Sequence, residues 1–300
     1  MSDQSHGEGK AEIKKLEKAL PSIRSALTAY GVRIFTRTDI EQIFAELREE
    51  WELNKRTSVK AFIDFMSSEG LREVKFNFPS RKETRYLWGD VSAFELAQSL
   101  KPNAYLTHRG AMFIHGLADG TPDIIYLNQE QPKTHQRNYA LTQEGIDRAF
   151  KNNPRLSNEV AEHDGLRVCV VHGQKTGGLG AVEVEGEQGE KIRVTGVERT
   201  LIDITVRPAY AGCASAVLEA YRRAQGKVSI PRLVEILREM DYVYPYHQAV
   251  GFYLDRAAVY EESELQLLEA IPMEFDFYLE NRLENPDYSE RWRLYFPKGM

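Results

Sequence analysis

The sequence predicts an α+β protein, and its 300 residues indicate about two domains rather than one small core. Apolar residues recur at helical spacing through residues 11–66, and two strand-like runs follow at once, over 71–78 and 83–88. Beyond these runs, short apolar strands alternate with amphipathic helices. We therefore expect an N-terminal winged helix-turn-helix over residues 11–95, followed by a larger mixed α/β C-terminal domain over residues 96–300.

The N-terminal domain is expected to begin with a helix that follows a short tail. Residues 1–10 are polar and predicted to be disordered, whereas residues 11–30 carry apolar side chains at three- and four-residue steps. A short strand over residues 32–35 and a second helix over residues 39–53 come next. This order of a helix, a strand and a helix is that expected for the first half of a winged helix.

The second helix has two candidate N-caps, and the third helix has a clear start. Thr38 with Glu41 three residues later fits a capping box, and Thr36 is the alternative cap. A turn at residues 54–57 leads to a third helix that begins at Thr57-Ser58. The side chains of this helix expected to face inward are Val59, Phe62, Ile63 and Met66.

The charge distribution singles out the third helix and the hairpin. The chain has a net charge of -6, yet residues 54–85 contain eight Lys and Arg against four Asp and Glu. Residues 258–300 contain four basic and ten acidic side chains. A helix of this kind can enter the DNA major groove while the basic turn at residues 79–82 touches phosphate. The acidic end should repel nucleic acid and face solvent or a basic protein.

The C-terminal domain is predicted to contain short strands and five helices. A strand over residues 104–106 leads to a helix that Thr107 caps. Further strands are expected over residues 124–127, 166–172, 181–185, 191–194, 274–278 and 291–296. Helices are expected over residues 197–205, 214–225, 230–240 and 246–257.

The sequence of the helix expected over residues 197–205 also predicts two local interactions. Thr195 is its expected N-cap, with Glu198 as the capping-box partner. Arg199 and Asp203 lie four residues apart and can pair on the helix surface, where such a pair contributes about 0.3–0.5 kcal/mol. We interpret this helix as a scaffold rather than a catalytic site.

Sets of catalytic residues are not recognisable in the sequence. Lys175-Thr176 precedes the glycines of its loop, whereas a phosphate-binding loop requires the opposite order, so a hairpin turn is predicted. Asp123, Glu183 and Glu185 suggest a metal-dependent nuclease only as a remote alternative, because Lys191 is out of register. The histidines lack metal-ligand spacing, and no nucleophile–base set can be assembled. We expect a binding protein rather than an enzyme, with no cofactor and no metal.

Composition indicates a cytoplasmic protein that does not enter a membrane. No apolar run approaches the roughly 20 residues of a membrane span, and the polar start lacks the apolar core of a signal peptide. The two cysteines, Cys169 and Cys213, are too few for a disulfide framework.

Three segments of the chain resemble the AbiEi antitoxin family of type IV toxin–antitoxin systems, which act in abortive infection and phage defence. The first is residues 104–117, AYLTHRGAMFIHGL, and the second is residues 195–203, TGVERTLID, followed by Arg207-Pro208 and Gly212. The third is residues 292–297, WRLYFP. The resemblance extends in order over roughly residues 30–300.

The resemblance implies a DNA-binding transcriptional autorepressor that is also an antitoxin. The N-terminal domain of this family binds inverted repeats in the promoter of its own operon. The C-terminal domain supports repression and counteracts a cognate nucleotidyltransferase-like toxin, directly or indirectly. The positions matching the DNA-reading helix and the wing are Lys55, Arg56, Thr57, Ser58 and Lys60, then Lys75, Ser80, Arg81, Lys82 and Arg85.

One feature departs from this expectation, and one alternative stays open. The second helix and its end carry six acidic residues against a lone Arg48, so this face must point away from DNA if DNA is bound. Winged helices also serve as protein-docking modules. The alternative is therefore an interaction module of a phage-defence complex that does not bind DNA.

Overall fold

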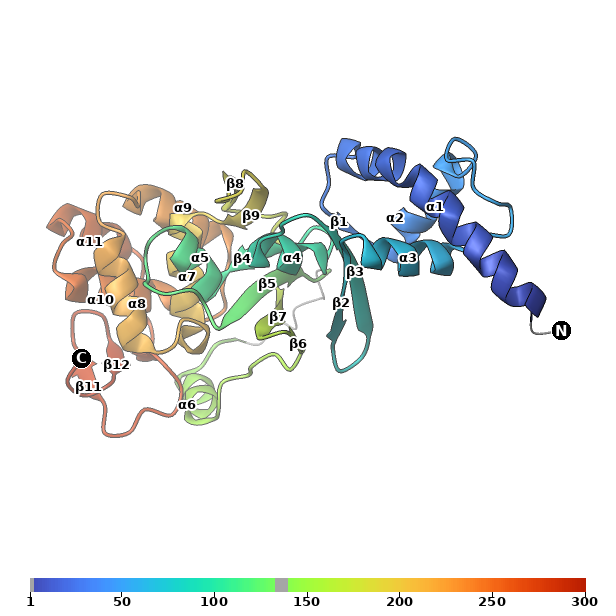
Figure 1. The fold of residues 1–300 in the computed structure, drawn as a ribbon. Coiled ribbons are helices and arrows are strands. Elements are labelled where there is room, and N and C mark those ends of the chain that lie inside the picture. Colours follow the sequence, from blue (N-terminus) through green and yellow to red (C-terminus); the bar gives the residue numbers. More distant parts are fainter. Residues whose placement is uncertain (1–2, 133–139) are drawn as a thin grey trace. The chain divides into compact units, whose positions relative to one another are not determined.

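The computed structural model describes residues 3–132 and 140–300, and it is α+β as the sequence predicts (Figure 1). The chain divides into two compact units. The first comprises residues 1–100 and 161–165, and the second comprises residues 101–160 and 166–300. The predicted boundary after residue 95 passes through a helix that the first unit contains whole.

The first unit alternates helices with a small antiparallel sheet, in which the strand order is β1-β3-β2. The elements are α1 (Asp3–Ala29), β1 (Ile34–Phe35), α2 (Arg37–Leu47), α3 (Val59–Ser68), β2 (Leu71–Asn77), β3 (Lys82–Trp88) and α4 (Ala93–Ser99). Helix α1 begins at Asp3, within the segment predicted to be a disordered tail. Residues 3–10 are therefore helical, and the prediction of a disordered tail over them is corrected.

Helix α2 is shorter than predicted, and Thr36 is its N-cap. Thr36 and Asp39 form a reciprocal capping box, in which the Asp39 carboxylate accepts from the Thr36 amide at 2.6 Å. The capping box predicted for Thr38 and Glu41 is therefore wrong, because Asp39 sits three residues after Thr36 and satisfies the free amide there. The helix ends at Leu47, and turns fill the rest of the range predicted to be helical.

The core of the first unit joins the three helices to the sheet. Its central side chains are aromatic, and the ring of Trp51 stacks on that of Phe62 at 5.6 Å between centroids. Ile23 of α1, Phe35 of β1 and Met66 of α3 are almost completely buried around them. Because α3 contributes one apolar side to this core, its other side is left to solvent.

The second unit is built on five neighbouring strands of a mixed sheet, in the order β7-β5-β4-β9-β8. They are β4 (Tyr105–Thr107), β5 (Ile124–Glu130), β7 (Leu166–Gly173), β8 (Ala181–Glu185) and β9 (Lys191–Thr195). Strand β6 (Val160–His163) falls mostly within residues 161–165, which belong to the first unit. The β5–β7 and β4–β9 pairs are parallel, whereas β4–β5 and β8–β9 are antiparallel.

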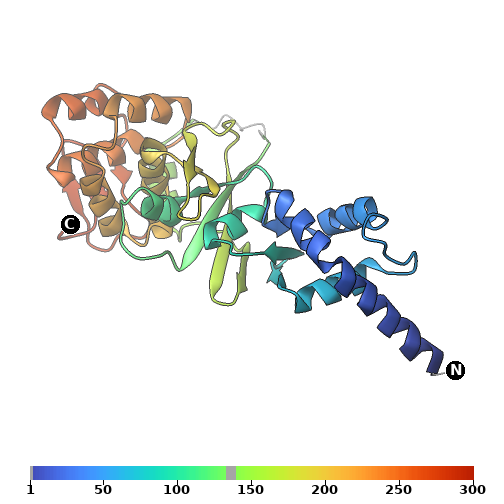
Figure 2. The same cartoon turned by 45° about the horizontal axis from the view of Figure 1, so that its top comes forward.

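Helices pack against this sheet and form most of the core of the second unit. They are α5 (His108–Ile114), α6 (Gln143–Lys151), α7 (Val197–Val206), α8 (Ala214–Arg223), α9 (Ile230–Glu239), α10 (Tyr246–Ala257) and α11 (Glu262–Glu269), with a 3-10 turn at Pro208–Tyr210. Figure 2 shows the orange and red helices gathered beyond the green and yellow strands. No helix in the described part of the chain combines the length and apolar character that a membrane span requires.

A small sheet closes the C-terminal end and anchors one tryptophan in the helical core. Its strands are β10 (Phe277–Tyr278), β11 (Asp287–Ser289) and β12 (Leu294–Phe296), in the order β10-β12-β11. Trp292 is completely buried, and its indole N–H donates to the Asp255 carboxylate at 2.8 Å. Gly251 of α10 lies directly under the ring, where a Cβ would overlap it.

Candidate functional site

Helix α3 is the element predicted to read DNA. The side chain of Ser58 caps its N-terminus. The Ser58 hydroxyl accepts a hydrogen bond from the Ala61 amide at 3.1 Å, which satisfies one of the amides that lack a helical partner. Phe62 and Met66 lie on the opposite side of the helix and are buried in the core. Lys60 is consequently exposed on the solvent side of the first turn.

Three basic side chains are exposed at this helix start, namely Lys55, Arg56 and Lys60. Lys60 pairs with Asp64 one turn later, at 2.9 Å between the amine and the carboxylate. Both side chains stay largely in solvent, and such a pair contributes only about 0–1 kcal/mol. Lys60 can therefore exchange its carboxylate partner for a phosphate at little cost.

The β2–β3 hairpin closes in a tight turn, with the Phe78 amide donating to the Arg81 carbonyl at 2.9 Å. Ser80 and Lys82 are exposed at this tip. The Arg81 guanidinium lies 4.3 Å from the centre of the Phe78 ring and pairs with Glu83 at 3.1 Å. The tip thus presents Ser80 and Lys82 freely, while Arg81 is held against its own hairpin.

Two of the predicted DNA contacts are buried, so their side chains do not reach the surface. Thr57 is only 4% exposed, and Arg85 is only 6% exposed. The Arg85 guanidinium donates to the Ser99 carbonyl at 2.7 Å and thereby ties β3 to α4. Lys75 does remain exposed, paired with Glu73 at 2.5 Å. The assignment of Thr57 and Arg85 to the surface is corrected, because strand and turn geometry directs them inward.

The acidic residues of α2 and its end mostly have partners within the first unit. Asp39 belongs to the capping box, and Glu46 accepts from the Tyr30 hydroxyl at 3.1 Å. Glu52 pairs with Lys18 at 2.9 Å, and Lys18 helps to hold the pKa of that carboxyl below its usual value. Of the three, only Glu52 has a cationic partner among the described residues, so Asp39 and Glu46 keep their negative charge although their oxygens are hydrogen-bonded.

Arg37 is a basic residue of this region that the sequence analysis did not select. It is the first residue of α2 and pairs with Glu41 at 2.8 Å, and this bond raises the pKa of the guanidinium. The charges of Glu73 on β2 and Tyr86 on β3 also raise the pKa of Arg37 slightly, which is consistent with a position near the hairpin strands. The sequence signal that could have identified Arg37 is its position as a basic residue at the start of α2, the helix before α3.

In the second unit, two of the segments that resemble the antitoxin family meet in a buried network. The Thr107 hydroxyl donates to the Asp203 carboxylate at 2.8 Å, and Arg199 donates to the same carboxylate at 2.7 Å. Arg199 also donates to the Leu179 carbonyl at 2.7 Å. Burial disfavours the charged guanidinium, but Asp203 outweighs it and raises the pKa of Arg199 above its usual range.

This network corrects three expectations about the C-terminal domain. The side chains of Arg199 and Asp203 are only 4% and 9% exposed, so they are not a surface pair. Thr107 makes no capping hydrogen bond, because its hydroxyl is committed to Asp203. Gly196 rather than Thr195 is the N-cap of α7, and Glu198 instead accepts a hydrogen bond from the amide of Ser229, the N-cap of α9.

The glycine-rich loop that follows β7 binds a carboxylate of the protein itself. The backbone amides of Thr176, Gly177 and Gly178 donate to Glu130 at 2.8–3.0 Å, and the Thr176 hydroxyl donates as well. Burial opposes ionisation, but these hydrogen bonds outweigh it and hold the pKa of Glu130 below its usual value. The loop is thus a turn that Glu130 organises. The predicted hairpin is wrong, because β7 and β8, which the loop joins, are not neighbours in the sheet.

The carboxylates that suggested a nuclease lie on separated strands. Asp123 immediately precedes β5, whereas Glu183 and Glu185 belong to β8, three strand positions away in the sheet. That spacing is about 14 Å, too far for a shared cation. Within residues 3–132 and 140–300, no group of three His, Cys, Asp or Glu side chains is placed to hold a metal ion.

Comparison with known proteins identifies a shared fold. No protein-family model matches the chain. No curated protein matches it either. Among solved structures, it is similar to the RV2827C protein from Mycobacterium tuberculosis, with a TM-score of 0.60 and 16% sequence identity. The match covers 93% of this chain and 91% of that one, so the likeness extends over both units.

Proposed function

We propose that the first unit is a winged helix-turn-helix that binds double-stranded DNA, with α3 in the major groove and the β2–β3 hairpin on the phosphate backbone. The order β1-α2-α3-β2-β3, in which β1 pairs with β3, is the observation that carries this proposal. The capped start of α3 and the hairpin tip both expose basic side chains. Groove contacts then specify sequence, whereas hairpin contacts fix position.

The full proposal is a transcriptional autorepressor that is also the antitoxin of a type IV toxin–antitoxin system. Its DNA site is the inverted repeat upstream of its own gene, and its toxin is a nucleotidyltransferase-like protein. This part rests on the resemblance of residues 104–117, 195–203 and 292–297 to the AbiEi family. In support, the first two segments are linked by the Thr107–Asp203 hydrogen bond in the core of the second unit.

Charge changes on α3 test the groove assignment. In gel-shift titrations at fixed salt, Lys60→Ala should weaken binding, because it removes a cation that faces the groove. Asp64→Asn should strengthen binding, because it removes a like charge from phosphate and releases Lys60. Lys191→Ala is the matched control, since Lys191 is an exposed, ion-paired lysine of the second unit. Equal affinities for all four proteins would contradict the groove assignment.

A protein-docking module is the second candidate, and the ion pairs of the first unit favour it. Lys60, Lys75 and Arg81 each have a carboxylate partner in the structure, which lowers the net positive potential of the surface. If the first unit is a docking module, Lys60→Ala, Asp64→Asn and Lys191→Ala should all leave DNA binding as it is in the wild type. A docking module predicts instead that the protein is recovered with a protein partner whose binding withstands nuclease treatment.

A further inference from the structure

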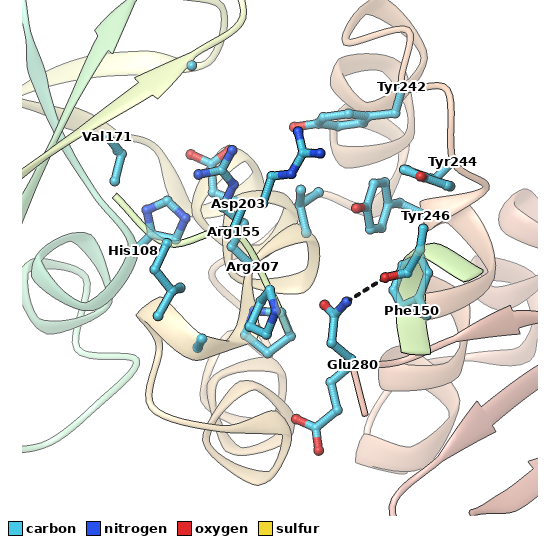
Figure 3. Close-up of a pocket in the computed structure, with 18 of the residues that line it drawn as sticks. His108, Phe150, Arg155, Val171, Asp203, Arg207, Tyr242, Tyr244, Tyr246 and Glu280 are labelled. Atoms are coloured by element: carbon cyan, nitrogen blue, oxygen red, sulfur yellow. Dashed lines mark hydrogen bonds between the residues drawn. The ribbon is translucent and has the colours of Figure 1, made fainter. Parts of the chain in front are cut away.

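A cavity of about 760 Å³ lies within the second unit (Figure 3). Its walls come from the start of α5, the end of β7, the end of α7, the segment between α9 and α10, and the chain after β10. The volume lies in the range of small-molecule sites in proteins, roughly 300–1,000 Å³. Its lining includes the buried Arg199–Asp203 pair and His108, Arg207, Pro208 and Gly212 of the segments that resemble the antitoxin family, but no ligand has been assigned to any of them above.

One wall of the cavity is aromatic. Tyr242, Tyr244 and Tyr246 alternate along the segment that leads into α10, and Figure 3 shows them on the side opposite His108. Two large apolar side chains of the lining, Leu156 and Val243, are each 57% exposed. Apolar side chains left in water beside an aromatic wall are what a planar, weakly polar ring would cover.

Two arginines of the lining lack an acidic partner. Neither Arg155 nor Arg207 forms an ion pair with any residue that the structure describes, and both are exposed. Arg199 differs, because Asp203 neutralises it. The other acid of the lining is Glu280, and burial raises the pKa of its carboxyl. The lining therefore carries an excess of positive charge that suits an anion.

A buried histidine adds a polar group without a partner. The Nδ1 atom of His108 makes no hydrogen bond to any described residue, although the side chain is only 5% exposed. The ring is held edge-on against Tyr210 at 5.0 Å between centroids. His108 also has a φ of +51°, a left-handed conformation that costs on the order of 1 kcal/mol for a residue other than glycine. A strained, buried and unpaired polar group at a cavity wall indicates a ligand contact.

We propose that this cavity binds a nucleotide, whose planar base packs on the tyrosine wall while its phosphate pairs with Arg155 and Arg207. His108 Nδ1 completes the site with a hydrogen bond to the ligand. Nucleotides are a class of ligand that joins a flat ring to an anionic group, as an aromatic wall and two cationic side chains in one cavity require. Burial lowers the pKa of His108 to about 4, so the imidazole is neutral near pH 7 and contributes a hydrogen bond rather than charge.

Calorimetric titration of the full chain tests this site with four nucleoside monophosphates: AMP, GMP, CMP and UMP. Adenosine and inorganic phosphate separate the two halves of the ligand. At least one nucleotide should bind tighter than either half. Arg155→Ala and Arg207→Ala should each weaken binding about tenfold, because each removes one charge-assisted hydrogen bond. Arg232→Ala, an exposed arginine of α9 outside the cavity, should leave affinity unchanged.

Other outcomes would overturn the proposal. Phosphate that binds as tightly as every nucleotide would show that the tyrosine wall holds no base. A nucleotide affinity that Arg155→Ala and Arg207→Ala do not change would place binding elsewhere. No detectable binding of any nucleotide would refute the site outright. The proposal does not depend on DNA binding by the first unit, because its probes and variants involve the second unit alone.

Discussion

The buried pair of Arg199 and Asp203 predicts a large loss of stability when it is broken. Asp203→Ala would leave a guanidinium whose side chain is 4% exposed with only the Leu179 carbonyl as acceptor, and the Thr107 hydroxyl without its partner. Removing one member of a buried pair typically costs about 3–5 kcal/mol. The surface pair inferred from sequence spacing would instead contribute about 0.3–0.5 kcal/mol. The two accounts therefore differ about tenfold in energy.

A double-mutant cycle in urea measures this difference. Asp203→Ala and Arg199→Ala should each lower the free energy of unfolding by about 3 kcal/mol or more, and the double variant should lose less than their sum. The exposed pair of Arg232 and Glu235, at 2.5 Å, is the control and should show coupling of about 0–1 kcal/mol. A cost below about 1 kcal/mol for Asp203→Ala would refute the buried network.

Three further predictions follow from particular contacts. Glu130→Gln should destabilise the protein by about 1–3 kcal/mol at pH 7. Since the folded-state pKa of Glu130 is lowered, the wild-type advantage should shrink as pH falls below about 4.5, in thermal unfolding at several pH values. Gly251→Ala should cost about 1–3 kcal/mol in urea unfolding by overlap with Trp292, although alanine is the better helix former. Lys82→Ala should leave the melting temperature unchanged and reduce the salt dependence of DNA binding by about 0.9 in slope.

The elements of the first unit were predictable because their signals are local. The spacing of Phe62, Ile63 and Met66 defines one face of α3, and all three are buried. The two strand-like runs on either side of residues 79–82 predict a hairpin, and the antiparallel ladder from Leu71–Trp88 to Asn77–Lys82 confirms it. Helices α7 to α10 were likewise predicted at nearly their observed bounds.

The environment of individual side chains was not predictable, because distant segments decide it. Arg199 and Asp203 have the spacing of a surface pair, and only the packing of α7 against α5 and the loop at Leu179 buries them. Arg85 is one of the eight basic residues counted over residues 54–85, yet its guanidinium is buried and donates to the Ser99 carbonyl.

The cavity of the second unit had no sequence signature at all. His108 and Tyr242 are 134 positions apart, and only the fold places them around one space. The tyrosines at alternate positions from Tyr242 to Tyr246 resemble an ordinary strand or core segment in the sequence. The unpaired Nδ1 atom of His108 can be recognised only in three dimensions.

The most direct test of the central claim is a gel-shift titration of the whole protein with the DNA immediately upstream of its gene. It should be run at two salt concentrations and in excess unrelated DNA. The proposed winged helix predicts a discrete complex that weakens with salt and survives the competitor. No shift, or a shift that unrelated DNA removes, would contradict sequence-specific DNA binding and leave the protein-docking module as the function of the first unit.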